Sequence, residues 1–212
     1  KFSIITVTYN AEDSIEGTVE SVISQSFKSF EYIIIDGAST DNTNEILKNY
    51  KKQINLIVSE KDEGLYDAMN KGILLAKGEF LLFLNAGDRL INNTVLNKVD
   101  SAITLKTRLV SADFMNVKEV GDVNGYYIET KACTIKNLRK DFSACHQTVF
   151  IHRSVVSDYD LSYKIKADYK WVLDALSKSD ENQVIKINYP IVNYDSDGFS
   201  AQKRFKNLFE LM

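Results

Sequence analysis

The chain has 212 residues, with 26 Lys and Arg against 29 Asp and Glu, and a formal net charge of −3. This balance gives no global basis for nucleic-acid binding, while 44% hydrophobic residues are enough for a real core. The two cysteines are too few for a disulfide scaffold and form no metal-ligand pattern. No apolar stretch approaches the roughly 20 residues that span a bilayer, and no signal peptide is visible. We therefore expect a cytoplasmic protein with one α/β domain over residues 1–212.

The first half of the chain alternates short apolar runs with helical patterns. Apolar runs without polar alternation are typical of strands buried on both faces of a parallel sheet. In chain order the pattern predicts strand 2–8, a helix through 15–23, strand 31–35, a helix through 46–50, strand 54–58, a helix through 66–73 and strand 79–84. Short connections in this order predict right-handed crossovers and a mostly parallel sheet flanked by helices.

After residue 90 this alternation of strand and helix ends, and the pattern predicts a mixed extension of the same sheet. The expected elements are a helix near 93–104, strand 108–114, a hairpin or long loop over 115–130, strand 147–152, a helix over 167–178, strands near 184–188 and 191–194, and a basic amphipathic tail helix. The whole chain is thus predicted to have a Rossmann-like architecture.

Three of the predicted strands end abruptly in polar or acidic residues. Tyr9, Asp36 and Asp88 follow strands 2–8, 31–35 and 79–84. Ligands of open parallel sheets bind beyond the carboxyl ends of the strands, so we expect these side chains at one rim. No glycine-rich phosphate loop accompanies them. An acidic rim of this kind indicates a nucleotide diphosphate that is held partly through a metal ion.

Five motifs, in their order and spacing, resemble those of family 2 glycosyltransferases, which have a GT-A fold. They are Val7-Thr-Tyr-Asn10, Ile35-Asp-Gly-Ala-Ser-Thr-Asp41, Gly64-Leu-Tyr-Asp-Ala-Met-Asn-Lys-Gly72, Leu84-Asn-Ala-Gly-Asp88 and Ala167-Asp168. The resemblance covers nearly the whole chain and implies an inverting, metal-dependent transferase that uses a nucleotide-diphosphate sugar, with UDP as the expected nucleotide. It implies a nucleotide-sugar-binding half over 1–90 and an acceptor-side half over 91–212.

The resemblance also assigns roles to residues of the first half. Asp88 is the expected ligand of Mn²⁺ or Mg²⁺, because hard cations take oxygen ligands and the diphosphate supplies several. Asn85 stands where the family usually has Asp, and it can accept a hydrogen bond or contact the ribose. Tyr9 offers a ring for stacking on the base, with Thr8 beside it, and Asp36 is expected to accept the imide N–H of uracil. The alternative for Asn85 and Asp88 is a turn capped by Asn and Asp, and the alternative for Asp36 is a cap of the following helix or the start of a turn.

Three residues of the segment 60–72 extend this expected nucleotide-sugar site. Asp62 follows a strand and reads the base edge from the opposite side. Asp67 is expected to hold sugar or ribose hydroxyls, and Lys71 to offset diphosphate charge as a point cation. A solvated lysine on a helix surface is the equally open alternative for Lys71.

The second half supplies the expected chemistry. An inverting transfer needs a carboxylate that takes the acceptor proton, and the resemblance places this base at Asp168. An N-cap role is compatible with it. His146 and Gln147 precede a strand on the acceptor side, where they contact either the diphosphate, the donor sugar or the acceptor. A structural role is the alternative for His146.

The expected setting, by the resemblance alone, is bacterial surface-polysaccharide assembly such as capsule or O-antigen, with a saccharide or lipid-linked acceptor. The segment 197–200 resembles a family turn near the diphosphate. The tail over 201–212 fits an ordinary surface helix, with peripheral contact to an anionic membrane as the alternative.

Two other functions stay open: a non-catalytic sugar-nucleotide-binding module, for which Asn85 leaves room, and a nucleotidyltransferase, which would normally show a glycine-rich phosphate loop.

Overall fold

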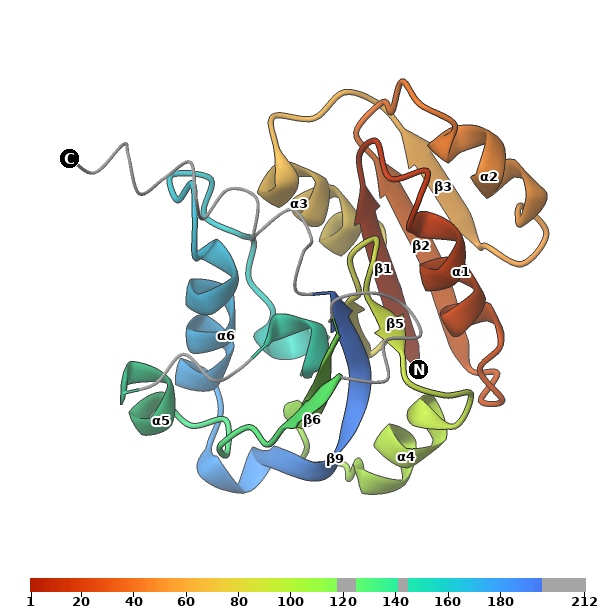
Figure 1. Ribbon diagram of the computed structural model, residues 1–212. Coiled ribbons are helices and arrows are strands. Elements are labelled where there is room, and N and C mark those ends of the chain that lie inside the picture. The colour runs from red at the N-terminus through yellow and green to blue at the C-terminus, as the bar shows by residue number, and fades with distance from the viewer. Residues whose placement is uncertain (118–124, 141–144, 196–212) are drawn as a thin grey trace.

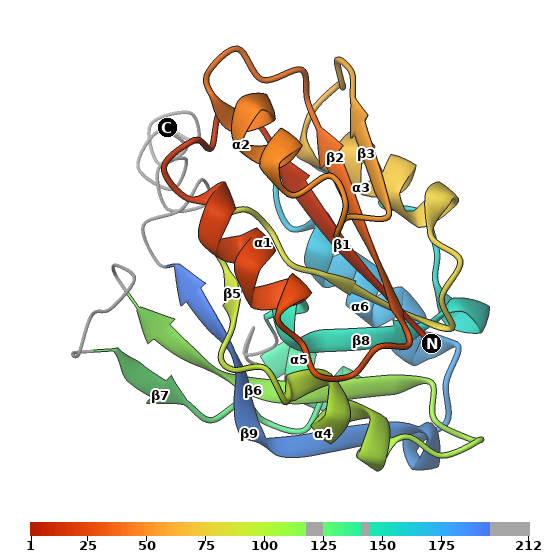
Figure 2. The same ribbon diagram turned by 90° about the vertical axis from the view of Figure 1, so that its right-hand side faces the viewer.

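The computed structural model describes residues 1–117, 125–140 and 145–195 of the chain, and in it helices cover both faces of one curved sheet (Figure 1, Figure 2). The helices are α1 (Ile15–Ile23), α2 (Thr43–Asn49), α3 (Leu65–Leu75), α4 (Val95–Ala102), α5 (Ile135–Lys140) and α6 (Ala167–Ser177), with short 3₁₀ turns η1 (His146–Thr148), η2 (Arg153–Val155) and η3 (Glu181–Gln183). The strands are β1 (Phe2–Thr8), β2 (Phe30–Asp36), β3 (Leu56–Ser59), β4 (Phe80–Phe83), β5 (Arg89–Leu90), β6 (Leu109–Val117), β7 (Tyr126–Ile128), β8 (Val149–His152) and β9 (Val184–Asp195).

The first half forms the predicted parallel sheet, in the order β3-β2-β1-β4. The register pairs Thr8 with Asp36 and Asp36 with Ser59, so the carboxyl ends of three strands are level. The loops that follow these strands lie together at one rim (Figure 1). The structure therefore confirms that the ends of the predicted strands meet at one edge.

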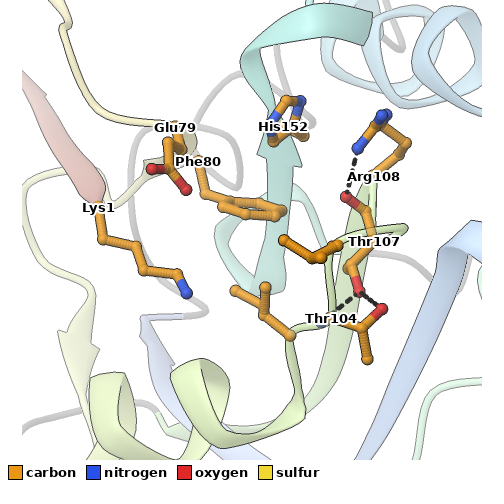
Figure 3. A pocket seen from close by; sticks show the side chains of 9 residues that line it. Lys1, Glu79, Phe80, Thr104, Thr107, Arg108 and His152 are labelled. Atoms are coloured by element: carbon orange, nitrogen blue, oxygen red, sulfur yellow. Dashed lines mark hydrogen bonds between the residues drawn. The ribbon is translucent and has the colours of Figure 1, made fainter.

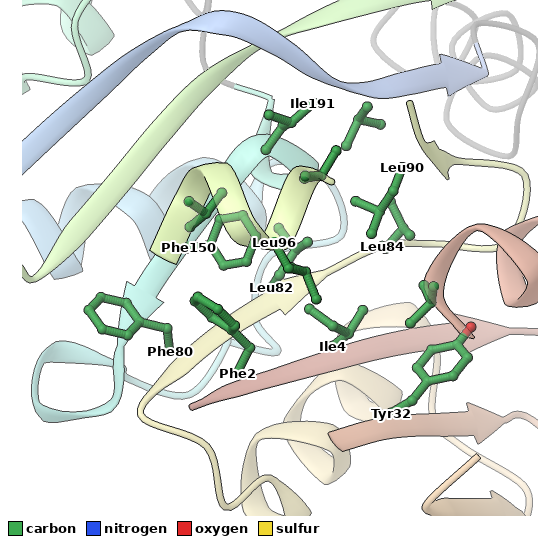
Figure 4. Packing of buried hydrophobic residues seen from close by; sticks show 14 of the residues in the cluster. Phe2, Ile4, Tyr32, Phe80, Leu82, Leu84, Leu90, Leu96, Phe150 and Ile191 are labelled. Atoms are coloured by element: carbon green, nitrogen blue, oxygen red, sulfur yellow. The ribbon is translucent and has the colours of Figure 1, made fainter. Parts of the chain in front are cut away.

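Buried side chains alternate along β1 and β2, which is why both faces of the sheet are covered. Ile4 and Ile34 pack in a cluster with α1, α2 and α4, whereas Ile5 and Ile35 pack in a second cluster with α3 and α6. In the first cluster the ring of Phe2 lies 5.4 Å from that of Phe150, centroid to centroid (Figure 4). Each large apolar side chain buried in this way contributes about 1.5–3 kcal/mol.

The second half extends the sheet with mixed pairing, as expected for the fold class. β8 pairs antiparallel with both β4 and β6, β9 runs parallel to β6, and β5 pairs antiparallel with β9. The register of β6 and β9 shifts around Asp113, which bends the pair. This bend lets the end of β9 lie beside the chain that follows β4.

Several details of the second half differ from the prediction. The two strands predicted near 184–188 and 191–194 form one continuous β9, because a shift in register carries the strand past its only proline, Pro190. The sequence pattern missed α5 and the two-residue β5, which are too short to show a period. For residues 115–130 the sequence predicted a hairpin or a long loop, and the antiparallel pairing of β6 with β7 agrees with the hairpin. No helix in the described part of the chain is both long and apolar enough to cross a bilayer.

Candidate active site

Asp36 ends β2 and is completely buried, so it lies beneath the rim rather than on it. One carboxylate oxygen accepts a hydrogen bond from the side chain of Asn44 at 2.9 Å and another from Ser59 at 2.5 Å. The backbone N–H and the hydroxyl of Ser39 also donate to this carboxylate. These donors anchor the loop 37–44. The expectation that Asp36 accepts the imide of uracil is not supported by this arrangement, because its oxygens already have protein partners.

Asp62 and the Tyr9 ring both lie close to Gly37. One of its oxygens accepts the N–H of Gly64 at 2.9 Å. The other, Oδ2, is only 2.6 Å from the point where a Cβ at Gly37 would stand, and the Tyr9 ring is 3.3 Å from the same point. Tyr9 is 60% exposed, so its ring is available for stacking. Thr8, at the end of β1, is buried and its hydroxyl has no hydrogen-bond partner among the described residues.

Asp67 and Lys71 face each other on α3, four residues apart. The Lys71 ammonium lies 2.9 Å from Glu60 and 3.5 Å from Asp67. The hydrogen bond to Glu60 is the main reason that the pKa of Lys71 is raised. Asp67 also accepts the N–H of Glu63 at 3.1 Å. The structure thus brings these two predicted residues together, and it already offsets the charge of Lys71 with carboxylates.

Asp88 lies in the turn after β4 and is 4% exposed. Burial raises the pKa of Asp88 to about 7, against a hydrogen bond from the backbone N–H of Asp195 at 3.1 Å and the charge of His146. The Gln147 side chain, which lies near Asp88, also lowers this pKa. Two residues of the same turn, Asn85 and Gly87, bring further oxygen atoms to the neighbourhood of Asp88. The side-chain oxygen of Asn85 is buried and has no partner in the part of the chain that the structure describes, and Gly87 has a φ of 102°, which lets the turn approach the Asp195 carboxylate.

Asp168 occupies the first turn of α6 and is held by His146. The Nδ1 atom of His146 lies 3.2 Å from a carboxylate oxygen of Asp168. Burial favours the neutral acid, but the hydrogen bond and charge of His146 and the backbone N–H of Tyr169 outweigh it and keep the pKa of Asp168 below its usual value. Asp168 is therefore ionised at neutral pH, as a general base must be.

His146 connects the two carboxylates on which the predicted chemistry depends. It lies in η1, is 8% exposed, binds Asp168 through Nδ1 and lies within electrostatic range of Asp88. Its Nε2 atom is buried and has no partner among the described residues. Asp88 and Asp168, 80 positions apart in the sequence, thus share one neighbourhood with His146 and Gln147.

A divalent cation fits the residues around Asp88. No group of three or more His, Cys, Asp or Glu side chains gathers to hold a metal by itself in the part of the chain that the structure describes. The backbone N–H of Asp195 donates to Asp88, however, the Asp195 carboxylate lies near Gly87 of the same turn, and the side-chain oxygen of Asn85 is buried with no partner among the described residues. This is the donor chemistry that Mg²⁺ and Mn²⁺ take, with the remaining ligands supplied by a diphosphate.

Sequence reasoning missed Asp195. It ends β9 and is 107 positions from Asp88, and only the pairing of β9 with β5 brings the two together. The one available signal was an acidic residue at the end of an apolar strand, the same pattern that marked Asp36. The family turn expected over 197–200 lies outside the described residues.

A cavity of 390 Å³ lies at the opposite ends of the strands, where β1 and β4 begin (Figure 3). Its lining includes Lys1, Glu79, Phe80, Arg108 and His152. None of the predicted site residues borders it. The candidate active site is therefore the rim that carries Tyr9, Asp62, Asp88 and Asp168.

Comparison with protein families gives a match to the model described as Glycosyl transferase family 2, over residues 3–170. A PGL/p-HBAD biosynthesis glycosyltransferase of Mycobacterium bovis is 30% identical over 184 residues, which cover 83% of this chain and 70% of the relative. The Escherichia coli protein WfaP, named UDP-Glc:alpha-D-GlcNAc-diphosphoundecaprenol beta-1,3-glucosyltransferase, is also 30% identical, over 177 residues that cover the same shares.

Among solved structures, S. aureus TarS 1–349 in complex with UDP-GlcNAc has a similar fold, with a TM-score of 0.75 and 20% sequence identity. The match covers 92% of this chain and 58% of the TarS chain, so the chain spans less than two thirds of that structure. This similarity confirms the predicted fold class.

Proposed function

The chain belongs to glycosyl transferase family 2, and on that basis we propose that it transfers a sugar from a UDP-sugar to a hydroxyl of a glycan or lipid-linked acceptor, with inversion. The observation that carries this proposal is the link through His146 between a buried carboxylate at the strand ends, Asp88, and an ionised carboxylate at the start of α6, Asp168. A module that only bound sugar nucleotides would need the first and not the second.

The donor end of the site is assigned to the rim of β1–β3. Tyr9 stacks on the base, and the Oδ2 atom of Asp62 accepts its ring N–H in the space above Gly37. Asp36 supports the loop beneath them. Asp67 and Lys71, which neutralise each other on α3, provide hydrogen bonds to sugar or ribose hydroxyls rather than a free cation.

At the diphosphate, Asp88 would hold Mn²⁺ or Mg²⁺, with Asn85 and Asp195 supplying further oxygen atoms. Such a cation neutralises the charge that develops on the departing diphosphate. Gln147 keeps the Asp88 carboxylate in place. The unused Nε2 atom of His146 is assigned to an oxygen of the diphosphate or the acceptor.

In the transfer step, the acceptor hydroxyl oxygen forms a bond to the anomeric carbon of the sugar from the side opposite the nucleotide. The bond from that carbon to the diphosphate oxygen breaks, and UDP leaves with the electron pair. Asp168 takes the hydroxyl proton, and His146 holds the carboxylate in its ionised form. A single displacement of this kind inverts the anomeric centre.

The proposal extends to the setting of the enzyme. WfaP is named for a lipid-diphosphate acceptor and the mycobacterial relative for PGL/p-HBAD biosynthesis. We therefore place this chain in the assembly of a surface polysaccharide such as capsule or O-antigen, with transfer on the cytoplasmic side. The tail over 201–212, to which membrane contact was assigned as one expectation, lies outside the described residues.

Replacing Asp168 by Asn tests the central assignment. The variant keeps the size and a hydrogen-bonding oxygen but cannot take a proton, so we expect UDP release from UDP-sugars with acceptor to fall by about 10³-fold while the affinity for UDP stays unchanged. Coupled UDP-release assays with Mn²⁺ measure the rate, and titration calorimetry measures the affinity. Turnover at the wild-type level in Asp168→Asn would remove the base assignment, and absence of UDP release by the wild type with any UDP-sugar would favour a binding module.

A further inference from the structure

Helix α3, on the donor side of the sheet, is tied to the segment that precedes α6. The Asn70 side chain forms two hydrogen bonds with the backbone of Tyr159: its oxygen accepts the Tyr159 N–H at 2.7 Å, and its amide donates to the Tyr159 carbonyl at 2.9 Å. The two residues are 89 positions apart. A two-point bond of this kind fixes both the position and the orientation of the backbone.

Aromatic rings reinforce this connection. The ring of Tyr66, one turn before Asn70 on α3, stacks on Tyr159 with 5.5 Å between centroids and 15° between planes. Tyr159 in turn stacks on Trp171 of α6, at 5.0 Å and 11°. The Trp171 indole donates to the carbonyl of Ser157 at 2.8 Å. The three rings form a continuous stack from α3 to α6.

The Tyr66 hydroxyl completes the connection at the start of α6. Burial and the charge of Asp168 raise the pKa of Tyr66 to about 12, and the nearby backbone N–H groups of Ala167, Asp168 and Lys166 at the start of the helix lower it. Lys166 has a φ of 68°, a conformation that a non-glycine residue adopts at some energetic cost. The hydroxyl thus lies beside the turn that carries Asp168, whose carboxylate contacts His146.

We propose that Tyr66 and Asn70 are positioning residues for the reaction: they hold the turn over 166–168 so that the Asp168 carboxylate points at the acceptor hydroxyl. The inference rests on the proposed role of Asp168 as the base. Asp67 and Lys71, which are assigned to the donor, directly follow Tyr66 and Asn70 on the same helix. One rigid helix thus contacts both the donor side and the turn that carries Asp168. This arrangement keeps the donor sugar and the base at a fixed distance and orientation.

The substitution Tyr66→Phe removes one oxygen and keeps the ring stack. We expect kcat to fall about tenfold, because the start of α6 loses the polar oxygen beside its backbone N–H groups, with the KM for the UDP-sugar and the affinity for UDP unchanged. Tyr50→Phe is the matched control, since the Tyr50 hydroxyl also joins two helices, through Glu16 at 2.9 Å, but far from the base. Its kcat should equal that of the wild type.

A second variant, Asn70→Asp, keeps the oxygen that accepts the Tyr159 N–H and loses the donor to the Tyr159 carbonyl. It should also lower kcat without changing UDP affinity. Wild-type kcat in both variants overturns the positioning role, and so does a joint loss of kcat, UDP affinity and melting temperature, which would show a merely structural role. Asp168→Asn, assayed in parallel, separates the two proposals: if it is active, the base assignment fails, and if it is inactive while Tyr66→Phe and Asn70→Asp are both fully active, only the positioning role fails.

Discussion

Asp88 illustrates how a single side chain can be placed at an energetic disadvantage to serve a ligand. It is almost completely buried, and the partners that the structure describes for it are the N–H of Asp195, Gln147 and the charge of His146. Holding the carboxylate ionised in this position costs roughly 4 kcal/mol, given a pKa of about 7 against the usual 3.8. A divalent cation would offset this cost, which is a physical reason to expect one there.

This disadvantage predicts a dependence of stability on pH. The folded state holds a proton on Asp88 that the unfolded state releases, so the contribution of Asp88 is fully present below pH 4 and is lost as the pH rises through about 7. With chelator present, we expect the free energy of unfolding of the wild type to fall by about 2–4 kcal/mol more between pH 5 and 8 than that of Asp88→Asn. Urea titrations at both pH values measure the difference. Parallel pH dependence in the two proteins would contradict it.

Asp62 shows the opposite case, a partly exposed carboxylate with one oxygen directed at the space above Gly37. A carboxylate can only accept hydrogen bonds, so it pairs with the ring N–H of uracil and repels the lone pair on N3 of cytosine. We predict that Asp62→Asn weakens UDP binding about tenfold and leaves CDP binding unchanged or tighter. Calorimetric titration of both nucleotides gives the ratio. Glu63→Gln, which removes a neighbouring exposed charge, is the control, and an unchanged UDP to CDP ratio in Asp62→Asn would refute the base-reading role.

At the scale of elements, the turn after β4 depends on a helix from the start of the chain. The buried hydroxyl of Thr18, in α1, donates to the carbonyl of Asp88 at 2.8 Å and accepts the N–H of Gly87 at 3.0 Å. Both backbone groups would otherwise be buried without partners. Helix α1 therefore holds the turn that presents Asp88 to the rim, in addition to covering one face of the sheet.

Thr18→Val tests this support because it keeps the shape of the side chain and removes only the hydroxyl. We expect the free energy of unfolding to fall by about 2 kcal/mol, since two buried backbone groups lose their partner. Urea unfolding measures the loss, and Thr40→Val, at an exposed threonine, should change stability by less than about 0.5 kcal/mol. A Thr18→Val protein as stable as the control would show that water or a shifted turn satisfies both groups.

At the scale of the whole molecule, the site is built between segments that different parts of the sheet supply. The parallel strands β1–β4 bring Asp88 and the residues proposed to read the base, while β9 and α6 bring Asp195 and Asp168. A UDP–cation complex would touch several of these segments at once. Its binding should therefore stabilise the fold as a unit rather than one loop.

This predicts a thermal shift that needs both ligands. With UDP and Mn²⁺ at about 100 times their dissociation constant, we expect the melting temperature to rise by about 5–10 °C, and by much less when a chelator replaces the metal. The Asp88→Asn variant should show no difference between the metal and chelator arms. A larger shift with GDP than with UDP would overturn the nucleotide assignment without affecting the fold.

The sequence alone was sufficient for the parallel half of the fold and for most of the rim. Runs such as 2–8 and 31–35 are buried on both faces, and a strand of this kind fixes which end its last polar residue occupies, so Tyr9 and Asp88 could be placed before any coordinates. The motifs also led to Asp168, because a residue that opens a helix is defined by local pattern.

The tertiary structure alone decided which carboxylates bind other protein groups and which have an oxygen directed at a space for a ligand. Asp36 and Asp62 look alike in the sequence, but Ser39, Asn44 and Ser59 fold over the first, while the absence of a side chain at Gly37 leaves room for the second. Asp195 and the tie between α3 and α6 depend on contacts across 107 and 89 positions. Such contacts follow from sheet order and from the bend in β9, and no local pattern of residues encodes them.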